Sequence, residues 1–518
     1  MSAFSWKLVY GGHTPPAGEV VRPDERLGWG HMAGLGAQHV VAMFGATFVF
    51  PVIMGLNPNL AVLMSGIATI MFLLIVGNKV PSYLGTSASF VGAVFAIRAQ
   101  GGDSADVTGS ILVAGVILAL VGVLVHFGGA HLVRAVLPPA VTGAVVMLIG
   151  FNLAFVATNI YFPADQWVGL LTAIFVILVA VGARGFLGRI AIFLGLIFGY
   201  LLSWALDQTS LKKCSTDAND ALKCVTGDRV NFASIRNADW LGIPKNITIT
   251  GADGKHHILS GAHLPSFSMT FILLVIPAVI ALLAENAGHV KAVSEMTGEN
   301  LDPYLGRAFI GDGVGTAIAS FVGGSPTTTY AENIGVMAAT RIYSTLAYYI
   351  AAVVAILFGF CPKFGALVAS TPSAVLGGIT LVLYGMIGLL GAKIWIENRV
   401  NFANPINLVP LAAGIIAGVG PLHFAITHKF SVSGIAAGTI LAVAGWHAAR
   451  PIAPPHLRDS LYTGPGASHE GQDVAGGSVI SVGPAGGDLS AAPGSEAERE
   501  DGEPHSGPRP PRGDDLDR

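Results

Sequence analysis

Long apolar runs separated by short polar connections make up most of the chain. A membrane-spanning helix needs about 20 mainly apolar residues. Runs of this kind begin near residues 32, 59, 83, 108, 138, 164, 190, 267, 305, 328, 343, 369, 403 and 430. The pattern predicts an all-α polytopic membrane protein with about fourteen transmembrane segments.

Two of these runs are weaker than the others. The third (PSYLGTSASFVGAVFAI) and the tenth (SPTTTYAENIGVMAA) are short and rich in Gly, Ser and Thr, and they carry Pro81 and Pro326 respectively. Interrupted segments at matching places in two halves point to a transporter site at the membrane midplane. Seven segments per half, an odd number, predict a 7+7 inverted repeat with short extended stretches in segments 3 and 10. The alternative is that the small residues only allow close helix packing.

Polar segments divide the chain into five parts. We expect a cytoplasmic N-terminal segment (1–31), a first seven-segment repeat (32–206), an extracytoplasmic insert (207–265), a second seven-segment repeat (266–449) and a disordered cytoplasmic tail (450–518). The tail is rich in Gly, Pro, Ser and charge, so it lacks the apolar surface that would offset the entropy of ordering. Lys and Arg are concentrated in the short loops on the side of the membrane where the N-terminus lies, which predicts that both termini are cytoplasmic.

Composition agrees with a chain dissolved mainly in lipid. Of its 518 residues, 52% are hydrophobic and 11% are charged, whereas soluble domains average about 25% charged residues. The net charge of −3 and the lack of a basic stripe exclude a nucleic-acid partner. Cys214 and Cys224 in the insert are equally compatible with a disulfide and with two thiols. His256, His257 and His263 are interpreted as surface histidines, because no Cys or acidic partner stands at metal-ligand spacing, and no metal is expected.

A few ionisable residues lie inside the apolar runs: His39, Glu285, His289, Asp312 and Glu332. A charge at a helix centre costs about 2.5–3.5 kcal/mol on insertion scales, so such residues are functional candidates. Glu285 and His289 are four positions apart and share one helix face. Because an imidazole titrates near neutral pH, the pair is a candidate proton carrier. A structural ion pair is the alternative interpretation.

Glu332 follows the run TTTYA, where the helical pattern breaks. If the chain is unwound there, free backbone N–H groups at the start of a half-helix face the same cavity as the carboxylate. The GTSAS stretch of the third segment offers similar donors from the other side. Two carboxylates with several backbone donors suit a small, neutral, planar ligand that carries both N–H and C=O groups, and they disfavour an inorganic anion. The sequence contains no GxSxG, HExxH or Walker loop, so no enzyme is predicted.

These residues resemble the nucleobase–ascorbate transporter family, also called nucleobase:cation symporter-2. The family signature is an acidic residue or Gln followed by Asn-x-Gly and, four residues later, Thr-Arg or Thr-Lys; ENIGVMAATR, from Glu332 to Arg341, matches it. The QH of the first span is Gln38-His39, and the AExxGH of the eighth ends at His289. The resemblance covers nearly all of residues 25–450 and is closest to bacterial uracil permeases of the Rut pyrimidine-utilisation type.

The resemblance implies core and gate domains, with segments 1, 3, 8 and 10 forming the site. It implies import of uracil, possibly thymine, by proton symport in a bacterial cytoplasmic membrane, without a cofactor; sodium remains an alternative coupling ion. A homodimer is the implied assembly. The implied substrate-binding residues are Glu285, Glu332, His289, Ala88, Ala331, Ser87 and Tyr330, and the implied proton-coupling residues are Glu285, His289 and His39.

Two positions depart from the uracil carriers of the family. Ala88 stands where they have Phe, and Ala331 stands where they have Gly. Both implied roles use the backbone N–H, so the donors remain, but the missing ring leaves more room for the base. A permease for xanthine or another purine is therefore one alternative, although Glu332 in place of Gln favours a pyrimidine. An anion exchanger or channel on the same fold is the other, and the carboxylate of Glu332 disfavours it.

Overall fold

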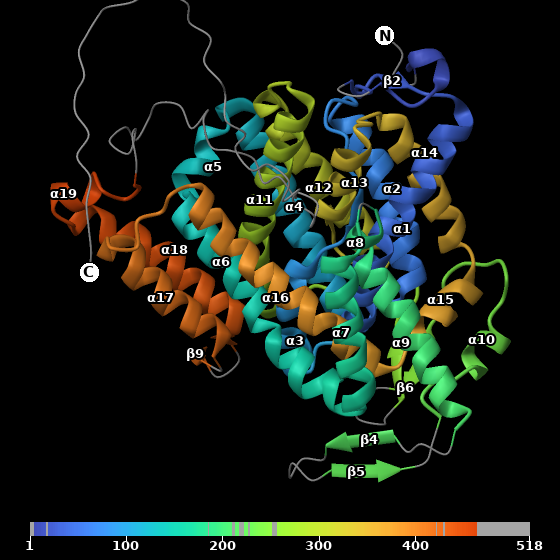
Figure 1. Ribbon diagram of the computed structural model, residues 1–518. Coiled ribbons are helices and arrows are strands. Elements are labelled where there is room, and N and C mark those ends of the chain that lie inside the picture. Colours follow the sequence, from blue (N-terminus) through green and yellow to red (C-terminus); the bar gives the residue numbers. More distant parts are fainter. Residues whose placement is uncertain are drawn as a thin grey trace, which may run out of the picture.

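The computed structural model describes residues 5–16, 19–184, 186–209, 213–216, 222–225, 228–250, 256–420, 422–427 and 430–463. Within this part the chain is mainly helical, and the helices form two groups that lie side by side (Figure 1). We call them the core group and the gate group, and their members follow.

The core group contains the helices that flank the two interrupted segments. Its members are α1 (Trp29–Met54), α2 (Pro58–Ile75), α3 (Val91–Ala99), α4 (Ser104–Gly128), α11 (Met269–Thr297), α12 (Leu305–Phe321), α13 (Ala331–Thr340) and α14 (Thr345–Gly359). Helix α4 packs along α12, and α2 packs along α14. The first contact is close because glycines line it: a Cβ at Gly115 would lie 2.8 Å from the carbonyl oxygen of Gly313.

The gate group lies against one side of the core group. Its members are α6 (Pro139–Asn152), α7 (Gln166–Gly182), α9 (Ala191–Asp207), α16 (Ser373–Glu397), α17 (Pro405–Val419) and α18 (Gly434–Ile452). Helix α6 crosses α16 and leads into a π-helical turn at Val156–Tyr161, and α17 packs on α18. Helix α11 of the core group contacts α6 and α18, so it lies at the seam between the groups.

Helix pairing follows the symmetry of an inverted repeat. Counted along the chain, the second segment (α2) packs against the eleventh (α14), and the fourth (α4) packs against the ninth (α12). The sixth segment packs against the seventh (α7 and α9), and the thirteenth packs against the fourteenth (α17 and α18) in the same way. These pairings and the paired extended stretches confirm the predicted 7+7 inverted-repeat fold. The count of fourteen spans is not confirmed. Among the described residues, six helices are long and apolar enough to cross a membrane, or seven if α14 and α15 (Pro362–Ala369), bent by 84°, form one span.

The two interrupted segments contain the extended stretches that the sequence predicts, and the structure shows that these stretches pair as a short antiparallel ladder. Strand β3 (Leu84–Thr86) pairs with β8 (Thr327–Thr329), and Gly85 lies opposite Thr328. A 3-10 turn at Ala88–Phe90 continues into α3, and α13 begins directly after Tyr330. In both segments a strand therefore leads into a half-helix.

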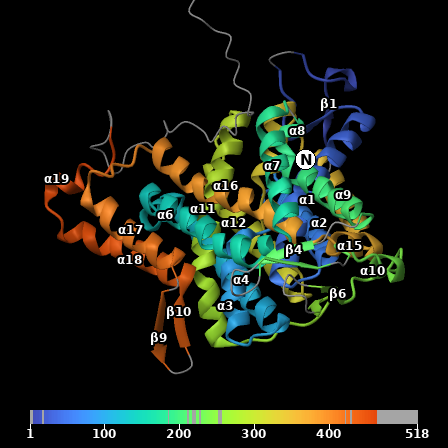
Figure 2. The same ribbon diagram turned by 60° about the horizontal axis from the view of Figure 1, so that its bottom comes forward.

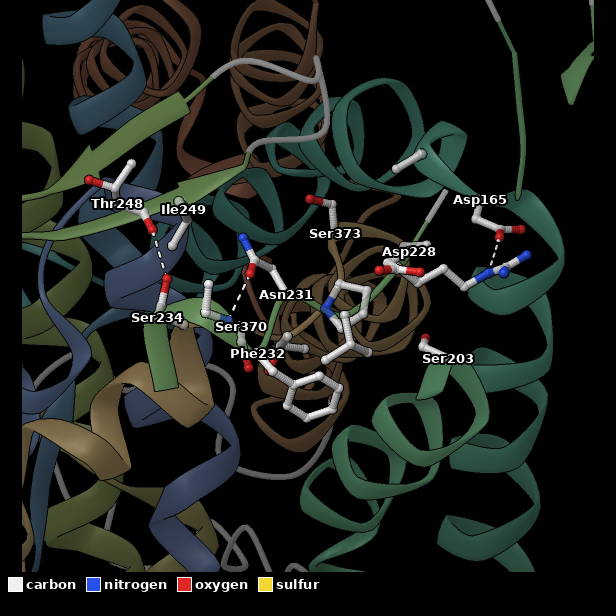
Figure 3. A pocket seen from close by; sticks show the side chains of 18 of the residues that line it. Asp165, Ser203, Asp228, Asn231, Phe232, Ser234, Thr248, Ile249, Ser370 and Ser373 are labelled. Atoms are coloured by element: carbon white, nitrogen blue, oxygen red, sulfur yellow. Dashed lines mark hydrogen bonds and ion pairs between the residues drawn. The ribbon is translucent and has the colours of Figure 1, made fainter. Parts of the chain in front are cut away.

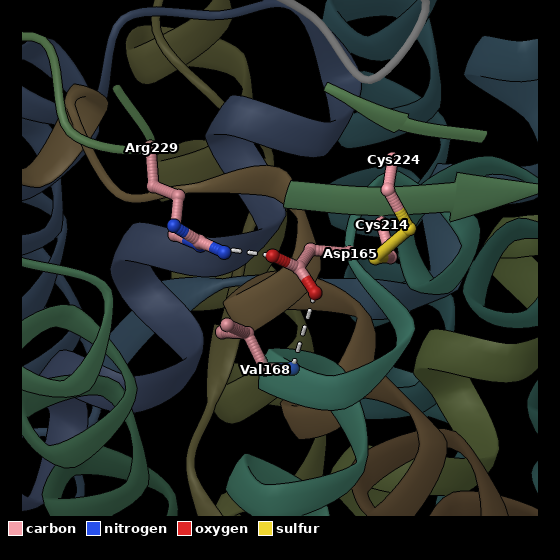
Figure 4. The surroundings of a disulfide bond; sticks show 5 residues. All are labelled: Asp165, Val168, Cys214, Cys224 and Arg229. Atoms are coloured by element: carbon pink, nitrogen blue, oxygen red, sulfur yellow. Dashed lines mark hydrogen bonds and ion pairs between the residues drawn. A yellow bond between two sulfur atoms is a disulfide. The ribbon is translucent and has the colours of Figure 1, made fainter. Parts of the chain in front are cut away.

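The insert forms small elements at one end of the molecule, opposite the end that carries β2 (Figures 1 and 2). It contains β4 (Lys213–Thr216), β5 (Leu222–Val225), α10 (Ala233–Asn237), β6 (Ile247–Thr250) and β7 (His256–Leu259). Cys214 and Cys224 lie opposite each other in the β4–β5 hairpin and form a disulfide, which decides between the two interpretations that the sequence left open (Figure 4).

The remaining elements connect the helices or cap their ends. They are β1 (Lys7–Leu8), β2 (Glu25–Arg26), α5 (His131–Val136), α8 (Phe186–Arg189), β9 (His423–Thr427), β10 (Phe430–Ser433), α19 (Pro455–Arg458) and short 3-10 turns at Tyr10–Gly12, Phe162–Ala164 and Asp302–Tyr304. The predicted disordered tail starts too early at 450. Helix α18 continues to Ile452. Leu461 is buried, and its carbonyl oxygen accepts from Asn401 N and Asn407 Nδ2. Residues 464–518 lie outside the described residues.

Candidate functional site

The β3–β8 ladder is buried in the core group and depends on one glycine. The ring of Tyr330 lies over Gly85, where a Cβ would come within 2.4 Å of the ring. The Tyr330 hydroxyl donates to the carbonyl oxygen of Thr86 at 2.8 Å and accepts from Thr47 Oγ1 at 3.1 Å. The side chain of Tyr330, a predicted substrate-binding residue, therefore fastens the two broken segments together.

The half-helix starts on either side of the ladder supply backbone donors. Helix α13 begins at Ala331 and the turn before α3 begins at Ala88, and the first N–H groups of a helix have no partner within it. Ser87 caps its turn by accepting from Ser89 N at 3.3 Å. The structure thus places Ala88 and Ala331 at the two positions where backbone N–H groups are free to meet a ligand.

Four of the predicted substrate-binding residues are accessible to water in a part of the chain that is otherwise buried. Ala88, Glu285, Ala331 and Glu332 are each partly exposed, although the residues before Ala88, after Glu332 and on both sides of Glu285 are buried. The charges of Glu285 and Glu332 are close enough to interact. Glu285 also accepts from Ser89 Oγ at 3.4 Å, which joins α11 to the third segment. Helix α11 also contacts both helix starts, so the two carboxylates and the two helix starts together form one candidate site.

His289 is held by hydrogen bonds that fix which ring nitrogen carries hydrogen. Asn286 Nδ2 donates to Asp312 Oδ2, so Asn286 Oδ1 points to Thr329 and accepts its hydroxyl hydrogen at 2.5 Å. Because that hydroxyl has a single hydrogen, Thr329 Oγ1 is the acceptor in its 2.7 Å contact with His289 Nδ1. The neutral ring is therefore protonated at Nδ1, and its Nε2 is free to accept a proton or a ligand N–H.

An ion pair between Glu285 and His289, the alternative interpretation of their spacing, is not formed in the described part of the chain, although one helix carries both residues. Glu285 bonds to Ser89, and His289 bonds to Thr329. The sequence identified Asp312 as a buried ionisable group, and it missed Asn286 and Thr329, which connect Asp312 to His289. The signal was weak because Asn286 adjoins a stronger candidate and Thr329 is one of three consecutive threonines.

His39 lies in a different part of the site from the other proton-coupling candidates. Its side chain is buried, and Asn333 Nδ2 donates to its Nδ1 at 3.2 Å and to its carbonyl oxygen at 2.9 Å. Its ring centroid lies 4.3 Å from that of Tyr348. These hydrogen bonds join His39 of α1 to Asn333 of α13, the residue that follows Glu332. They do not connect His39 to the hydrogen bonds around His289. No group of three or more His, Cys, Asp or Glu residues that could hold a metal occurs among the described residues.

Comparison with known sequences gives matches over most of the chain. A model of the Permease family matches residues 30–425. RutG of Escherichia coli (strain K12), a candidate pyrimidine permease, is 42% identical over 432 residues, which cover 82% of this chain and 90% of that protein. The uracil permease of Bacillus subtilis (strain 168) is 34% identical over 421 residues, which cover 78% of this chain and 89% of that protein.

Solved structures share the fold at low sequence identity. The transmembrane domain of the cyanobacterial bicarbonate transporter BicA matches with a TM-score of 0.52 and 13% identity, over 81% of this chain and 97% of that domain. The murine anion transporter Slc26a9, in its inward-facing state, matches with a TM-score of 0.57 and 11% identity, over 80% of this chain and 67% of that one. At these identities the likeness extends to the fold alone.

Proposed function

The chain belongs to the Permease family, the nucleobase:cation symporter-2 family, and from this premise we propose that it imports uracil by proton symport. Membership makes it a multi-pass membrane transporter and not an enzyme. The relatives at 42% and 34% identity are named for pyrimidine and uracil transport, which supports uracil as the substrate.

The observation that carries the proposal is the grouping of two carboxylates, Glu285 and Glu332, with two helix starts. Uracil is planar and neutral, and it has two ring N–H groups and two carbonyl oxygens. In the proposed complex Glu285 and Glu332 accept from the N–H groups, and the backbone N–H groups of Ala88 and Ala331 donate to the oxygens; the helix starts at Ala88 and Ala331 support these roles. An anion would meet two carboxylates there, so the anion transport named for the fold neighbours does not suit this site.

The coupling proton is proposed to enter at His289 or Glu285. His289 Nε2 is the free nitrogen of a ring whose Nδ1 is occupied by Thr329. Protonation of Glu285 removes a charge that must otherwise be desolvated when core and gate groups close over the base, and protonation of His289 offsets part of the negative charge of the two carboxylates. The proton leaves when the site opens to the cytoplasm. The proposal also includes both termini in the cytoplasm of a bacterial cell and a homodimeric assembly.

Uptake of labelled uracil into membrane vesicles tests substrate and coupling ion together. We expect an imposed inward proton gradient to raise accumulation, and a protonophore to remove the effect at constant sodium. Accumulation that follows a sodium gradient instead would refute proton coupling. In competition, excess unlabelled uracil should inhibit most strongly, thymine less, and xanthine least. Dominant inhibition by xanthine would assign the carrier to purines.

Replacing Thr329 by valine should slow uracil uptake about ten-fold or more. Valine has nearly the same shape but lacks the hydroxyl, so it leaves His289 Nδ1 and Asn286 Oδ1 without their buried partner; each such loss costs about 1–3 kcal/mol. The pH dependence of the uptake rate should change as well, because the His289 tautomer is no longer fixed. Thr329→Ser restores the hydroxyl and should restore both rate and pH profile. Equal behaviour of the two variants would exclude this role.

A further inference from the structure

The insert binds to the gate group at one end and to the core group at the other. Its first part, with the β4–β5 hairpin, packs on α7 and on the turn at Phe162–Ala164. Its later part packs on α15, which in turn contacts α2 and α14 of the core group. The insert therefore crosses the seam between the two groups on one face of the membrane.

The attachment to the gate group is a buried cluster of three charges. Arg229 of the insert contacts Asp165 at 2.9 Å and Asp207 at 3.3 Å, and the three side chains are 4%, 3% and 6% exposed. Asp165 caps the start of α7 and contacts Arg229 (Figure 4). Asp207 is the last residue of α9. Asp207 also accepts from the backbone N–H groups of Arg229 and Val230. One guanidinium thus joins the ends of two gate helices.

The attachment to the core group uses neutral hydrogen bonds spread over several loops. Asn57, at the start of α2, donates to the carbonyl oxygen of Lys245 at 2.6 Å, and Ser260 Oγ bonds to Ser104 Oγ at 2.6 Å. His263 is not the surface histidine that the sequence predicts, because its ring contacts Thr108 Oγ1 at 3.2 Å in α4. Ser266 passes so close to α4 that a Cβ at Gly109 would lie 1.6 Å from its carbonyl oxygen.

A cavity of about 500 Å³ lies where the insert passes from one attachment to the other (Figure 3). Arg229 and Ile249 of the insert line it, together with Ser203 of α9 and Ser370 and Ser373 at the junction of α15 and α16. The insert thus spans an unfilled space between its two attachments.

We propose that the insert is a strap that holds the gate group to the core group on this face, and that Arg229 with Asp165 and Asp207 is its releasable attachment. The proposal rests on the alternating access of a transporter and not on the identity of its substrate. When the two groups move relative to each other, either the charge cluster must open or the insert must move with it. Separating the guanidinium from carboxylates that stay buried is unfavourable because it leaves unpaired charges out of water, so the attachment favours the state in which this face is closed.

Thiol labelling of Ser203→Cys, in a Cys361→Ser background, tests the strap. Ser203 is buried and lines the cavity, and Cys214 and Cys224 are joined in the disulfide. A membrane-impermeant maleimide is applied separately to intact cells and to inverted vesicles. We expect R229M, and the double variant D165N/D207N, each to raise the labelling rate about ten-fold from the insert side. Each asparagine keeps one oxygen, which can still cap α7 or accept from the Arg229 and Val230 N–H groups, and it replaces the other oxygen by an NH₂ group, so the attraction for the guanidinium is lost.

The matched control is the ion pair between Lys245 and Asp239 in the same insert, whose side chains are 80% and 63% exposed. K245M should leave labelling unchanged, because exposed pairs contribute little.

Combining R229M with D165N/D207N should add nothing to either change in labelling rate, since all three substitutions act on one cluster. If R229M fails to insert into the membrane, R229K is the substitute: lysine keeps the positive charge but lacks the planar guanidinium that contacts both carboxylates. R229K should raise the labelling rate less than ten-fold. Unchanged labelling in an inserted R229M or D165N/D207N protein would overturn the strap. The labelling uses no substrate, so a carrier of another base would give the same result.

Discussion

Glu332→Gln should weaken uracil binding about 100-fold and remove measurable uptake. In the proposed site the Glu332 carboxylate accepts from a ring N–H of the base, at the start of α13, where the helix dipole also favours a negative charge. A hydrogen bond to a charged group contributes about 1.5–3 kcal/mol, and each 1.4 kcal/mol is a factor of ten in affinity. Glutamine also carries an NH₂ group that can face the ligand N–H, so the change can replace an attraction by a repulsion. Equilibrium binding of labelled uracil to the purified protein measures the effect.

The matched control for this change is Glu397→Gln. Glu397 pairs with Lys393 one helical turn earlier, at the end of α16 in the gate group, and it is not part of the proposed site. An i,i+4 pair of this kind contributes about 0.3–0.5 kcal/mol, so uracil affinity should be unchanged. An inserted Glu332→Gln protein that binds uracil as the parent does would rule out the proposed role of this carboxylate.

Gly85→Ala should reduce uptake at least about 30-fold in a chain that still inserts. The added methyl group would lie 2.4 Å from the Tyr330 ring and 2.6 Å from Thr47 Oγ1, so the ring must move away from β3. Overpacking of this kind costs about 1–3 kcal/mol, and the displaced Tyr330 also loses its bonds to Thr86 and Thr47. The ladder that aligns the two helix starts is thereby distorted. Uptake and membrane abundance are measured on the same preparation.

Gly34→Ala is the control for the glycine substitution. Gly34 lies in α1, and a Cβ there would have nothing within 4 Å. Alanine is favoured over glycine in a helix by about 1 kcal/mol, so this variant should be as stable as the parent and fully active. Normal uptake in Gly85→Ala would mean that Tyr330 can be accommodated elsewhere and that the ladder does not depend on this contact.

The sequence predicted the features of this site that have a local signature. A carboxylate in an apolar run is conspicuous, so Glu285 and Glu332 were identified, and a Gly/Ser/Thr-rich stretch next to a proline marked both broken segments. The i,i+4 spacing was a weaker guide. It put Glu285 and His289 on one face of α11 but could not reveal that each has its own partner.

Contacts between residues that are far apart in the chain could not be predicted from the sequence. His289 and Thr329 are 40 positions apart, and His39 and Asn333 are 294 apart. A single sequence has no periodicity that links such pairs, because the links arise only when the repeats pack together. Arg229 shows the same limit, since an arginine in a polar loop is typical of a solvated surface and burial appears only once Asp165 and Asp207 are brought to it.

The β3–β8 ladder has a consequence for how the protein is made. Thr86 and Ser325, which bond across it, are 239 residues apart, so a ribosome completes the first strand long before its partner exists. Until then the backbone groups of Leu84–Thr86 have no strand to pair with, and unpaired backbone is costly in lipid. The nascent first repeat must therefore keep its third segment near water or the insertion machinery until the second repeat arrives. The proposed binding site takes residues from both repeats, so it is complete only at that moment.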